Sequence, residues 1–317
     1  MGSPFYAEIK KFPLLTRPVE LFELISTFGG HHVFVAQDSP EDFAFGGNKV
    51  RFYEYLIPEI LEKKPDFLLT SGSSFSNHVR VTAEVCYRLG IGCRLLIEDD
   101  APADGVHSPN VARAISLGAS VEYIGAFAAM LKISEYAKKL SDGGENFYHV
   151  PNAGHTPFGA CAYAEFLSKA LDASDGISFG EIWAPCASGT TVTGLCAGRA
   201  VLGTDAVPPV RGVAVGNTVR GAGRGIRKLI LESSGTIPGY PSQPELPDII
   251  DCGKNGYGAP DAELLSLRGH IYEKEGLLLD RTYNLNAFYG MMKTLEENPG
   301  DGNVLYVCTG GYRQLGL

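Results

Sequence analysis

The sequence lacks features that several classes of protein require. It contains no run of about 18 apolar residues, so no helix is expected to span a membrane. It also lacks an excess of basic residues: the net charge is −9, and such a surface repels a phosphate backbone, so no nucleic-acid partner is expected. The start, Met1-Gly2-Ser3-Pro4, has neither the basic nor the apolar region of a secretory signal, so a cytoplasmic location is expected.

Cysteine and histidine patterns exclude two further classes. The seven cysteines are odd in number and form no C-x-x-C motif, so we expect buried, reduced thiols rather than a disulfide framework. The seven histidines show no metal-ligand spacing, and no metal site is predicted. His31 and His32 follow a Gly-Gly turn and are expected in a surface loop.

What the chain does contain is an alternation of short apolar runs with segments of helical period. Its 317 residues, 44% of them apolar, suffice for two α/β lobes with substantial cores. The alternation predicts mainly parallel sheets flanked by helices, with ligands bound at the carboxyl ends of the strands. The expected strands are 67–70, 94–97, 121–124, 147–150, 182–185, 210–215 and 304–308, and the expected helices are 79–89, 110–117, 126–140, 158–171, 194–202 and 285–298.

Lys49 lies where the segment Phe45-Gly46-Gly47-Asn48 passes into an expected helix. Apolar residues from Val50 to Leu61 recur with helical period, which places Lys49 in the first turn. The positive end of the helix dipole disfavours a cation there, lowers the lysine pKa and favours the neutral amine that attacks an aldehyde. An exposed lysine at a helix start fits the same pattern.

A hydroxyl-rich loop, 71–76, separates the first expected strand from the helix that follows. Small residues at a helix start leave backbone N–H groups available to an anion. Ser76 and Asn77 are therefore candidates for ligand binding, and a plain N-cap role for either one remains open.

A second hydroxyl-rich loop, Ala187–Gly194, directly follows the expected strand 182–185 and opens a helix. It lacks the Gly-Lys-Ser/Thr ending of a P-loop and is no G-x-G-x-x-G fingerprint. Its glycines, hydroxyls and helix start still suit a phosphate, although a glycine-rich strand-to-helix turn explains them too. The candidate phosphate ligands are Ser188, Gly189, Thr190 and Thr191.

Taken in order along the chain, these segments resemble the 1-aminocyclopropane-1-carboxylate (ACC) deaminase / D-cysteine desulfhydrase family. Phe45-Gly46-Gly47-Asn48-Lys49-x-Arg51 resembles the family's lysine segment for pyridoxal 5'-phosphate (PLP), and Ser76-Asn77-His78-x-Arg80 resembles its second signature. The set is completed by Gly256-Tyr257-Gly258-x-Pro260, Leu278-Leu279-Asp280-x-x-Tyr283 and Thr309-Gly310-Gly311.

The resemblance implies the fold type II class of PLP enzymes, similar to tryptophan synthase β. Such a chain has two α/β domains with PLP in the cleft between them. We predict a larger PLP-binding domain from residues 1–52 and 166–317 and a smaller α/β domain from residues 53–165. Family members are usually homodimers, so a homodimer is expected.

The resemblance also assigns roles to individual residues. Lys49 would carry PLP as a Schiff base, and Ser76 would meet the substrate carboxylate. Tyr257 and Tyr283 would face the substrate as acid, base or nucleophile. The cofactor would further be held by Asn77, Ser188, Gly189, Thr190, Thr191, Asn284 and Thr309.

Several positions depart from the family pattern. Asn284 stands where the deaminases carry Glu, and the desulfhydrases usually Thr, facing the pyridine nitrogen. A neutral amide cannot keep that nitrogen protonated by charge. Phe52 replaces a usual basic residue, and Phe75 replaces a common Gln. His155, in the substrate-loop position, either touches the substrate or is a loop histidine without a role.

The predicted function is a PLP-dependent lyase or deaminase acting on a small amino-acid substrate. ACC deamination and D-cysteine elimination, each giving a keto acid and ammonia, are both open. So are PLP-dependent β-substitution or a specialised biosynthetic step on the same scaffold, and a PLP-binding protein that has lost turnover. A nucleotide-binding α/β protein, with another phosphate at Ser188–Gly194, is the remaining alternative.

Overall fold

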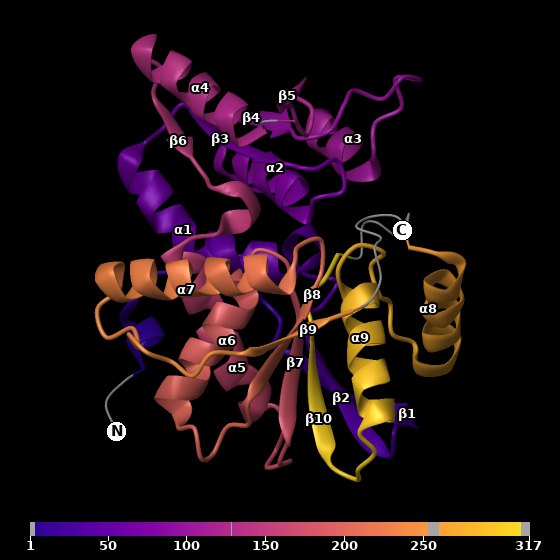
Figure 1. Cartoon of the computed structure of the whole chain (residues 1–317). Coiled ribbons are helices and arrows are strands. Elements are labelled where there is room, and N and C mark those ends of the chain that lie inside the picture. The colour runs from indigo at the N-terminus through magenta and orange to yellow at the C-terminus, as the bar shows by residue number, and fades with distance from the viewer. Residues whose placement is uncertain (1–3, 128, 253–259, 312–317) are drawn as a thin grey trace. The chain divides into compact units, whose positions relative to one another are not determined.

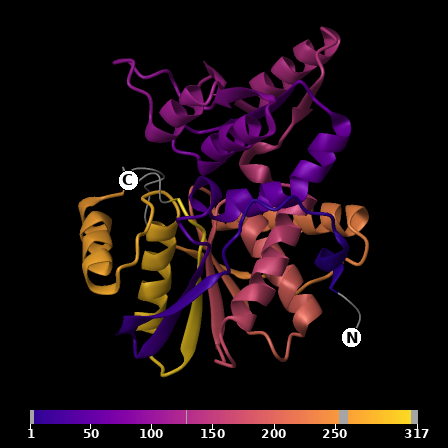
Figure 2. The same ribbon diagram turned by 180° about the vertical axis from the view of Figure 1, so that it is seen from behind.

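The computed structural model describes residues 4–127, 129–252 and 260–311, and the chain divides into two compact units (Figures 1 and 2). The first unit contains the described residues up to Tyr55 and from His155 onward, and the second contains Leu56–Gly154. Helix α1 (Asn48–Lys63) carries the chain from the first unit into the second. The chain returns to the first unit before α5 (Pro157–Asp172), so this whole helix lies in the first unit.

A six-stranded sheet in the order β1-β2-β10-β7-β8-β9 forms the first unit. Strands β1 and β2 are antiparallel, and every other pair is parallel. The central strands are almost entirely buried because helices cover both faces of the sheet. The strands are β1 (Glu20–Phe28), β2 (His31–Gln37), β7 (Glu181–Cys186), β8 (Val210–Ala214), β9 (Asp248–Asp251) and β10 (Asn303–Cys308).

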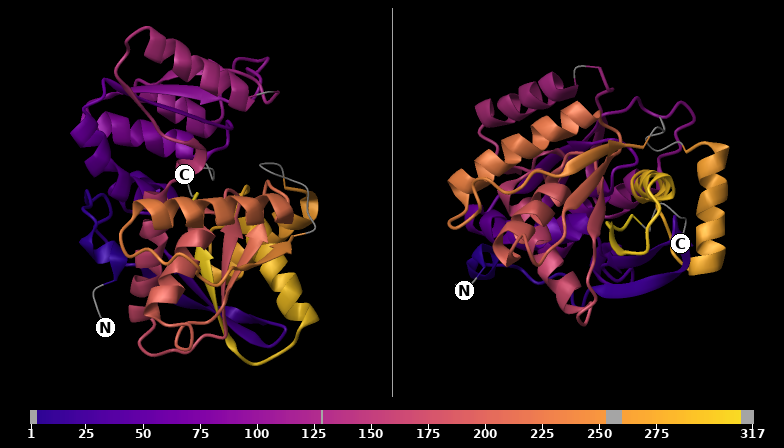
Figure 3. Two further views of the ribbon diagram at one scale, coloured as in Figure 1. Left: turned by 60° about the vertical axis from the view of Figure 1, so that its left-hand side comes forward. Right: turned by 60° about the horizontal axis from the view of Figure 1, so that its bottom comes forward.

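Helices α5, α6 (Thr190–Leu202) and α7 (Val219–Thr236) pack against one another in this unit. Helices α8 (Ala262–Glu275) and α9 (Asn284–Glu297) lie on the other side of the sheet (Figure 3). Helices α5 and α6 approach closely because α6 carries glycine where they cross: a Cβ on Gly194 would lie 2.3 Å from the carbonyl oxygen of Ala160. Short 3₁₀ turns lie at Phe5–Glu8 and Phe43–Phe45.

The second unit has a four-stranded, fully parallel sheet in the order β5-β4-β3-β6. Its core contains Phe67, Leu69, Leu96 and Leu140, and Leu140 comes from α4. The other helices are α2, which contacts β3 and β4, and α3, which packs on α2. The elements are β3 (Phe67–Gly72), α2 (Asn77–Leu89), β4 (Gly92–Ile97), α3 (Pro109–Ser116), β5 (Ser120–Tyr123), α4 (Ala129–Asp142), β6 (Phe147–His149) and a 3₁₀ turn at Asn152–Gly154.

The α/β class with mainly parallel sheets is confirmed, and each expected strand and helix corresponds to an observed element. All seven cysteine side chains are buried, as expected. The prediction of a loop at His31–His32 is wrong, because both residues begin β2 after a tight turn in which Gly29 and Gly30 have positive φ. Across the described residues, no helix combines the length and the apolar character that crossing a membrane requires.

Candidate active site

Lys49 is the second residue of α1 and follows two glycines in left-handed backbone conformations. Its side chain is buried, and its Nζ lies 4.8 Å from the centre of the Phe52 ring. Burial lowers the pKa of Lys49 from 10.5 to about 7, because the charged ammonium loses its hydration. Near neutral pH a large fraction of this amine is therefore uncharged and nucleophilic.

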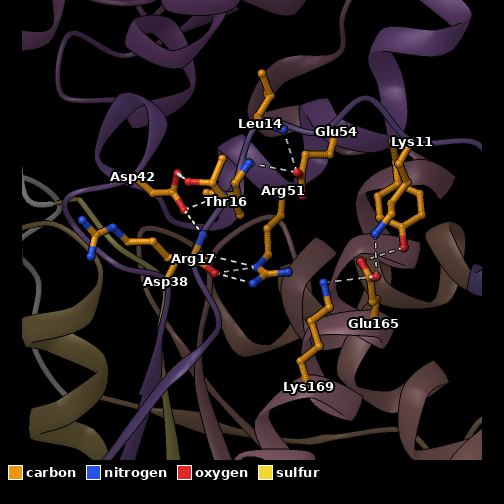
Figure 4. A network of polar contacts seen from close by, with 12 residues as sticks. Lys11, Leu14, Thr16, Arg17, Asp38, Asp42, Arg51, Glu54, Glu165 and Lys169 are labelled. Carbon is orange, nitrogen blue, oxygen red and sulfur yellow. Dashed lines mark hydrogen bonds and ion pairs between the residues drawn. The ribbon is translucent and has the colours of Figure 1, made fainter.

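The first turns of α1 are fixed by buried polar contacts (Figure 4). Arg51 Nε lies 2.8 Å from both carboxylate oxygens of Asp38, which follows β2. Burial alone would lower the pKa of Arg51, but Asp38 raises it above its ordinary value, so Arg51 stays charged. Glu54 accepts hydrogen bonds from the backbone N–H groups of Leu14 and Leu15. The helix that carries Lys49 is thus held to the sheet and to the N-terminal segment.

The predicted phosphate loop follows β7 and leads into α6. Gly189 is the N-cap of α6, with φ of 91°, and a Cβ at this position would lie 2.7 Å from Ile226. The hydroxyls of Ser188 and Thr190 lie 3.1 Å apart, and Nδ1 of His155 lies 2.9 Å from the Thr190 hydroxyl. This turn combines the N–H groups at a helix start with clustered hydroxyls.

The start of α9 is organised around Asp280, which is fully buried. Its carboxylate accepts hydrogen bonds from the backbone N–H groups of Thr282, Tyr283 and Asn284 and from Asn284 Nδ2, at 2.7–3.0 Å. Asn284 Nδ2 also donates to the carbonyl of Gly310, and its Oδ1 accepts from the Thr309 N–H. Both amide hydrogens of Asn284 are therefore engaged within the chain, and any role toward a pyridine nitrogen stays a prediction.

Three hydrogen bonds join these segments. The Asn48 N–H donates to the carbonyl of Thr309, and Asn48 Nδ2 donates to the hydroxyl of Thr191, both at 3.2 Å. The Thr309 N–H donates to Asn284 Oδ1 at 2.9 Å. Lys49, the Ser188–Thr191 loop, Thr309 and the start of α9 thus gather at the carboxyl ends of β7 and β10, where parallel sheets bind ligands.

The remaining predicted residues belong to the second unit or fall outside the described residues. Ser76 is the buried N-cap of α2 in the second unit, where its hydroxyl accepts from the His78 N–H at 3.2 Å. Asn77 is buried, and its Oδ1 has no hydrogen-bond partner within the part of the chain that the structure describes. Tyr257, with its Gly-Tyr-Gly segment, lies outside the described residues.

These residues fit an aldehyde cofactor with a phosphate tail. The Lys49 amine is buried and easily deprotonated, and the nearby Ser188–Thr191 loop offers hydroxyl and N–H donors for a phosphate.

A family model described as "Pyridoxal-phosphate dependent enzyme" matches residues 13–310. The chain belongs to the pyridoxal-phosphate dependent enzyme family. The match spans the lysine segment, the Ser188–Thr191 loop and the C-terminal strand, and PLP is the cofactor of this family.

Individual members of the family are similar over nearly their whole length. A Pyrococcus horikoshii protein with the provisional name 1-aminocyclopropane-1-carboxylate deaminase is 27% identical, covering 98% of this chain and 95% of the relative. A D-cysteine desulfhydrase of Yersinia enterocolitica is 29% identical, covering 96% of this chain and 95% of the relative. A solved structure titled as an ACC deaminase homologue has a TM-score of 0.87 and 25% identity, covering 98% of this chain and 94% of that one.

These similarities confirm the predicted family resemblance, the fold type II class and the PLP cofactor. They also confirm, at the level of the family, a PLP-dependent enzyme of the lyase and deaminase type. Identities near 27% do not specify a substrate.

The lowered pKa of Lys49 predicts how the cofactor-free enzyme reacts with pyridoxal, which lacks the phosphate. Only the neutral amine has the lone pair that attacks an aldehyde, so the rate should fall as pH drops below the pKa. We expect a midpoint near pH 7, whereas an exposed lysine needs a pH near 10.5. Stopped-flow absorbance between pH 5.5 and 10 measures the midpoint, and a value above pH 9 would contradict the desolvated amine.

Two residues beside the site gain a role that their sequence positions did not specify. Asp280 organises the start of α9, and the signal that could have revealed it is an aspartate just before a helix start. For His155 the sequence allows either contact with the substrate or no role. In the structure its Nδ1 lies 2.9 Å from the Thr190 hydroxyl. Nothing in its local sequence indicates this contact, because the two residues are brought together only by the fold.

Proposed function

We propose that this enzyme is a lyase that converts a small amino acid into a keto acid and ammonia. It would either open the ring of ACC or eliminate a leaving group from the β-carbon of a substrate such as D-cysteine. The observation that carries the proposal is the buried Lys49 amine, with its pKa near 7, joined through Asn48 and Thr309 to the phosphate loop and to the segment of Tyr283. The names of the relatives support the same two chemistries.

In this proposal the first unit is the PLP-binding domain, and PLP supplies the electron sink for charge at the substrate α-carbon. The Lys49 amine forms the covalent link and exchanges a proton at the reacting substrate carbon. The first turn of α6 binds the phosphate. Tyr283, half-buried at the start of α9, exchanges a proton with the departing or newly protonated substrate atom.

The resemblance supplies further assignments for residues outside this cluster. Ser76 would bind the substrate carboxylate, and Asn77 would hold the cofactor ring. Tyr257 would act as a second tyrosine on the substrate. A homodimer in the cytoplasm completes the proposal, and light scattering tests the dimer by a mass twice the 34.0 kDa of the chain.

The function is tested by incubating the PLP-loaded protein with ACC, D-cysteine and β-chloroalanine. We expect ammonia and a keto acid, in equal amounts, from at least one of them. Tyr283→Phe should keep the visible absorbance of bound PLP and lose turnover, because only its hydroxyl is removed. Absence of product from all three substrates would reject the proposal, and spectral change without product would favour a PLP-binding protein without turnover.

His155 gives a prediction that is specific to the phosphate. Burial lowers the pKa of His155, so the ring is neutral at pH 7. When Nδ1 carries the ring hydrogen and donates to Thr190, the Thr190 hydroxyl is left to donate to an anion. His155→Ala should weaken PLP binding by about three- to tenfold, the worth of one hydrogen bond between neutral groups.

The control for this variant uses the same protein and a different aldehyde. Pyridoxal lacks the phosphate, so its affinity should not change in His155→Ala. His270→Ala, on the exposed face of α8, should bind both aldehydes like the wild type. Equal losses for PLP and pyridoxal in His155→Ala would mean that the histidine does not act through the phosphate loop. Absorbance titration of the three cofactor-free proteins with each aldehyde measures all six affinities.

A further inference from the structure

A groove of about 470 Å³ lies on the first unit, and its lining does not include the Ser188–Thr191 loop. One wall is α7, from Val219 to Arg227, and the other is the segment Leu246–Ile249 that leads into β9. This segment runs alongside α7 in Figures 1 and 3. The volume falls within the range of small-molecule sites, and none of the roles assigned above uses this groove.

Three arginines give the groove its charge. Arg220, Arg224 and Arg227 all line it, and spacings of four and three residues place them on one face of α7. All three are exposed, and none forms an ion pair with any residue that the structure describes. The one carboxylate lining the groove, Asp248, already lies 3.3 Å from Arg211. A protein with net charge −9 thus concentrates uncompensated positive charge at one small cavity.

This arrangement is unfavourable for α7 in the absence of a ligand. Like charges at these spacings repel one another, and Arg220 lies in the first turn, at the positive end of the helix dipole. Surface arginines that only kept the protein soluble would not need to share one face of a helix. Their clustering is explained if an anion neutralises them together.

Gly223 lies between the arginines and lines the same groove. Glycine inside a helix is destabilising relative to alanine, so a packing reason is expected. Gly221 and Gly225 have one, since a Cβ would come within 2.2 Å of Asn217 Oδ1 and 3.0 Å of the Ser188 oxygen, respectively. A Cβ on Gly223 would meet only the end of the Arg227 side chain, at 3.7 Å. The bare backbone leaves room for a group that approaches α7 closely.

We infer that this groove binds a small organic phosphate of the nucleoside diphosphate class. One guanidinium group can donate two parallel hydrogen bonds to a phosphate. The three guanidinium groups of the groove offer more donors than one ligand carboxylate can accept, which favours a ligand with more than one phosphate. Leu246, Pro247 and Ile249 supply an apolar wall for a planar ring, on which an arginine can also stack. The groove lining does not include the residues of the PLP phosphate loop, although α7 packs against that loop at Ile226, and the inference does not depend on the proposed reaction.

The test is calorimetric titration of the PLP-saturated enzyme with ADP, so that the cofactor's own phosphate loop is filled. We expect one ADP bound per chain, with affinity that falls as salt rises. Arg224→Ala and Arg220→Ala should each raise the dissociation constant about tenfold, as the loss of one charge-assisted pair predicts. Lys228→Ala is the matched control, because Lys228 lies on the same helix, pairs with Glu232 and does not line the groove.

A second variant separates binding from folding. Gly223→Leu fills the groove without changing charge, and leucine favours a helix more than glycine. This variant should lose ADP binding while its melting temperature stays at or above that of the wild type. Saturable ADP binding that Arg224→Ala, Gly223→Leu and Lys228→Ala leave equally unchanged would overturn the inference. Failure of the wild-type holoenzyme to bind ADP would overturn it as well.

Discussion

Replacing Lys49 with alanine is expected to abolish the visible absorbance band that PLP gains on covalent attachment, and to lower turnover by at least about a thousandfold. Lys49 supplies the amine that bonds to the aldehyde, and its burial makes that amine available near neutral pH. Non-covalent contacts from the phosphate loop remain in the variant. PLP should therefore still bind, with the spectrum of the unattached aldehyde. Absorbance spectra of the purified variant, with and without added PLP, measure this.

A matched control lies on the same helix. Lys63 is exposed near the end of α1 and pairs with Glu59, so Lys63→Ala should keep both the band and full turnover. Borohydride reduction followed by mass spectrometry of peptides locates the attachment directly. Labelled cofactor recovered on a lysine other than Lys49 in the wild type would contradict the assignment, even if Lys49→Ala were inactive.

The environment of Lys49 shows which of two opposing effects dominates. The Phe52 ring, 4.8 Å from Nζ, attracts the charged ammonium, and such contacts are worth about 0.5–2 kcal/mol. Lowering the pKa from 10.5 to about 7 corresponds to about 5 kcal/mol against the charged form. Burial therefore outweighs the ring. The phenylalanine that replaces the family's usual basic residue contributes to an apolar surrounding that keeps the amine reactive.

Much of the fold could be predicted because parallel strands are buried on both faces. Strands such as β3 and β7 are therefore short apolar runs, and the amphipathic helices between them have a clear period. Helix α6 was harder to place: the prediction began it at Gly194, and it begins at Thr190. β-Branched residues have low helix propensity, and here the turn at Gly189 and tertiary packing outweigh that preference.

Three of the elements that the sequence did not indicate, α7, α8 and β9, have weak local signals. Helix α7 contains several glycines, which argue against a helix, and its conformation depends on close backbone packing that only the fold provides. Helix α8 buries only Leu264 and Ile271, so its apolar stripe is thin. Strand β9 is four residues long with an aspartate at each end. In each case long-range packing, rather than local preference, determines the structure.

The candidate site likewise contains residues that the sequence indicates and contacts that only the fold produces. Lys49 and the Ser188–Thr191 loop stand out locally, because glycines and hydroxyls accumulate beside a strand or helix end. The hydrogen bonds that join them run through Asn48 and Thr309, which lie within recognisable motifs, but nothing in the sequence indicates that these two residues meet. For Asn284 the sequence predicts only that a neutral amide cannot keep the pyridine nitrogen protonated by charge, and the structure adds that this amide contacts Thr309 and Gly310. These partners directly follow β10 and could not be identified from spacing.

The backbone at the start of α9 is expected to depend on Asp280 more than on any other residue of the candidate site. Replacement by asparagine should lower the free energy of unfolding by about 2–4 kcal/mol. Both oxygens of the carboxylate accept hydrogen bonds, and an amide keeps only one acceptor. Its NH₂ group would face the N–H groups of Thr282 and Tyr283. Burial raises the pKa of Asp280 above its ordinary value, although the hydrogen bonds act in the opposite direction. Asparagine would leave the N–H groups of Thr282 and Tyr283 without an acceptor.

Asp261 provides the matched comparison. It caps α8, where its Oδ1 accepts from the Leu264 N–H at 2.9 Å, and it is exposed. Asparagine caps helices as well as aspartate does, so Asp261→Asn should change stability by less than about 0.5 kcal/mol. Urea unfolding of the two variants measures the difference, and equal stabilities would refute the double-acceptor role of Asp280. Asp280 accepts hydrogen bonds from the Tyr283 backbone and the Asn284 side chain, so Asp280→Asn should also lower kcat at least about tenfold while PLP stays covalently bound. A purely structural role would leave kcat of the folded fraction unchanged.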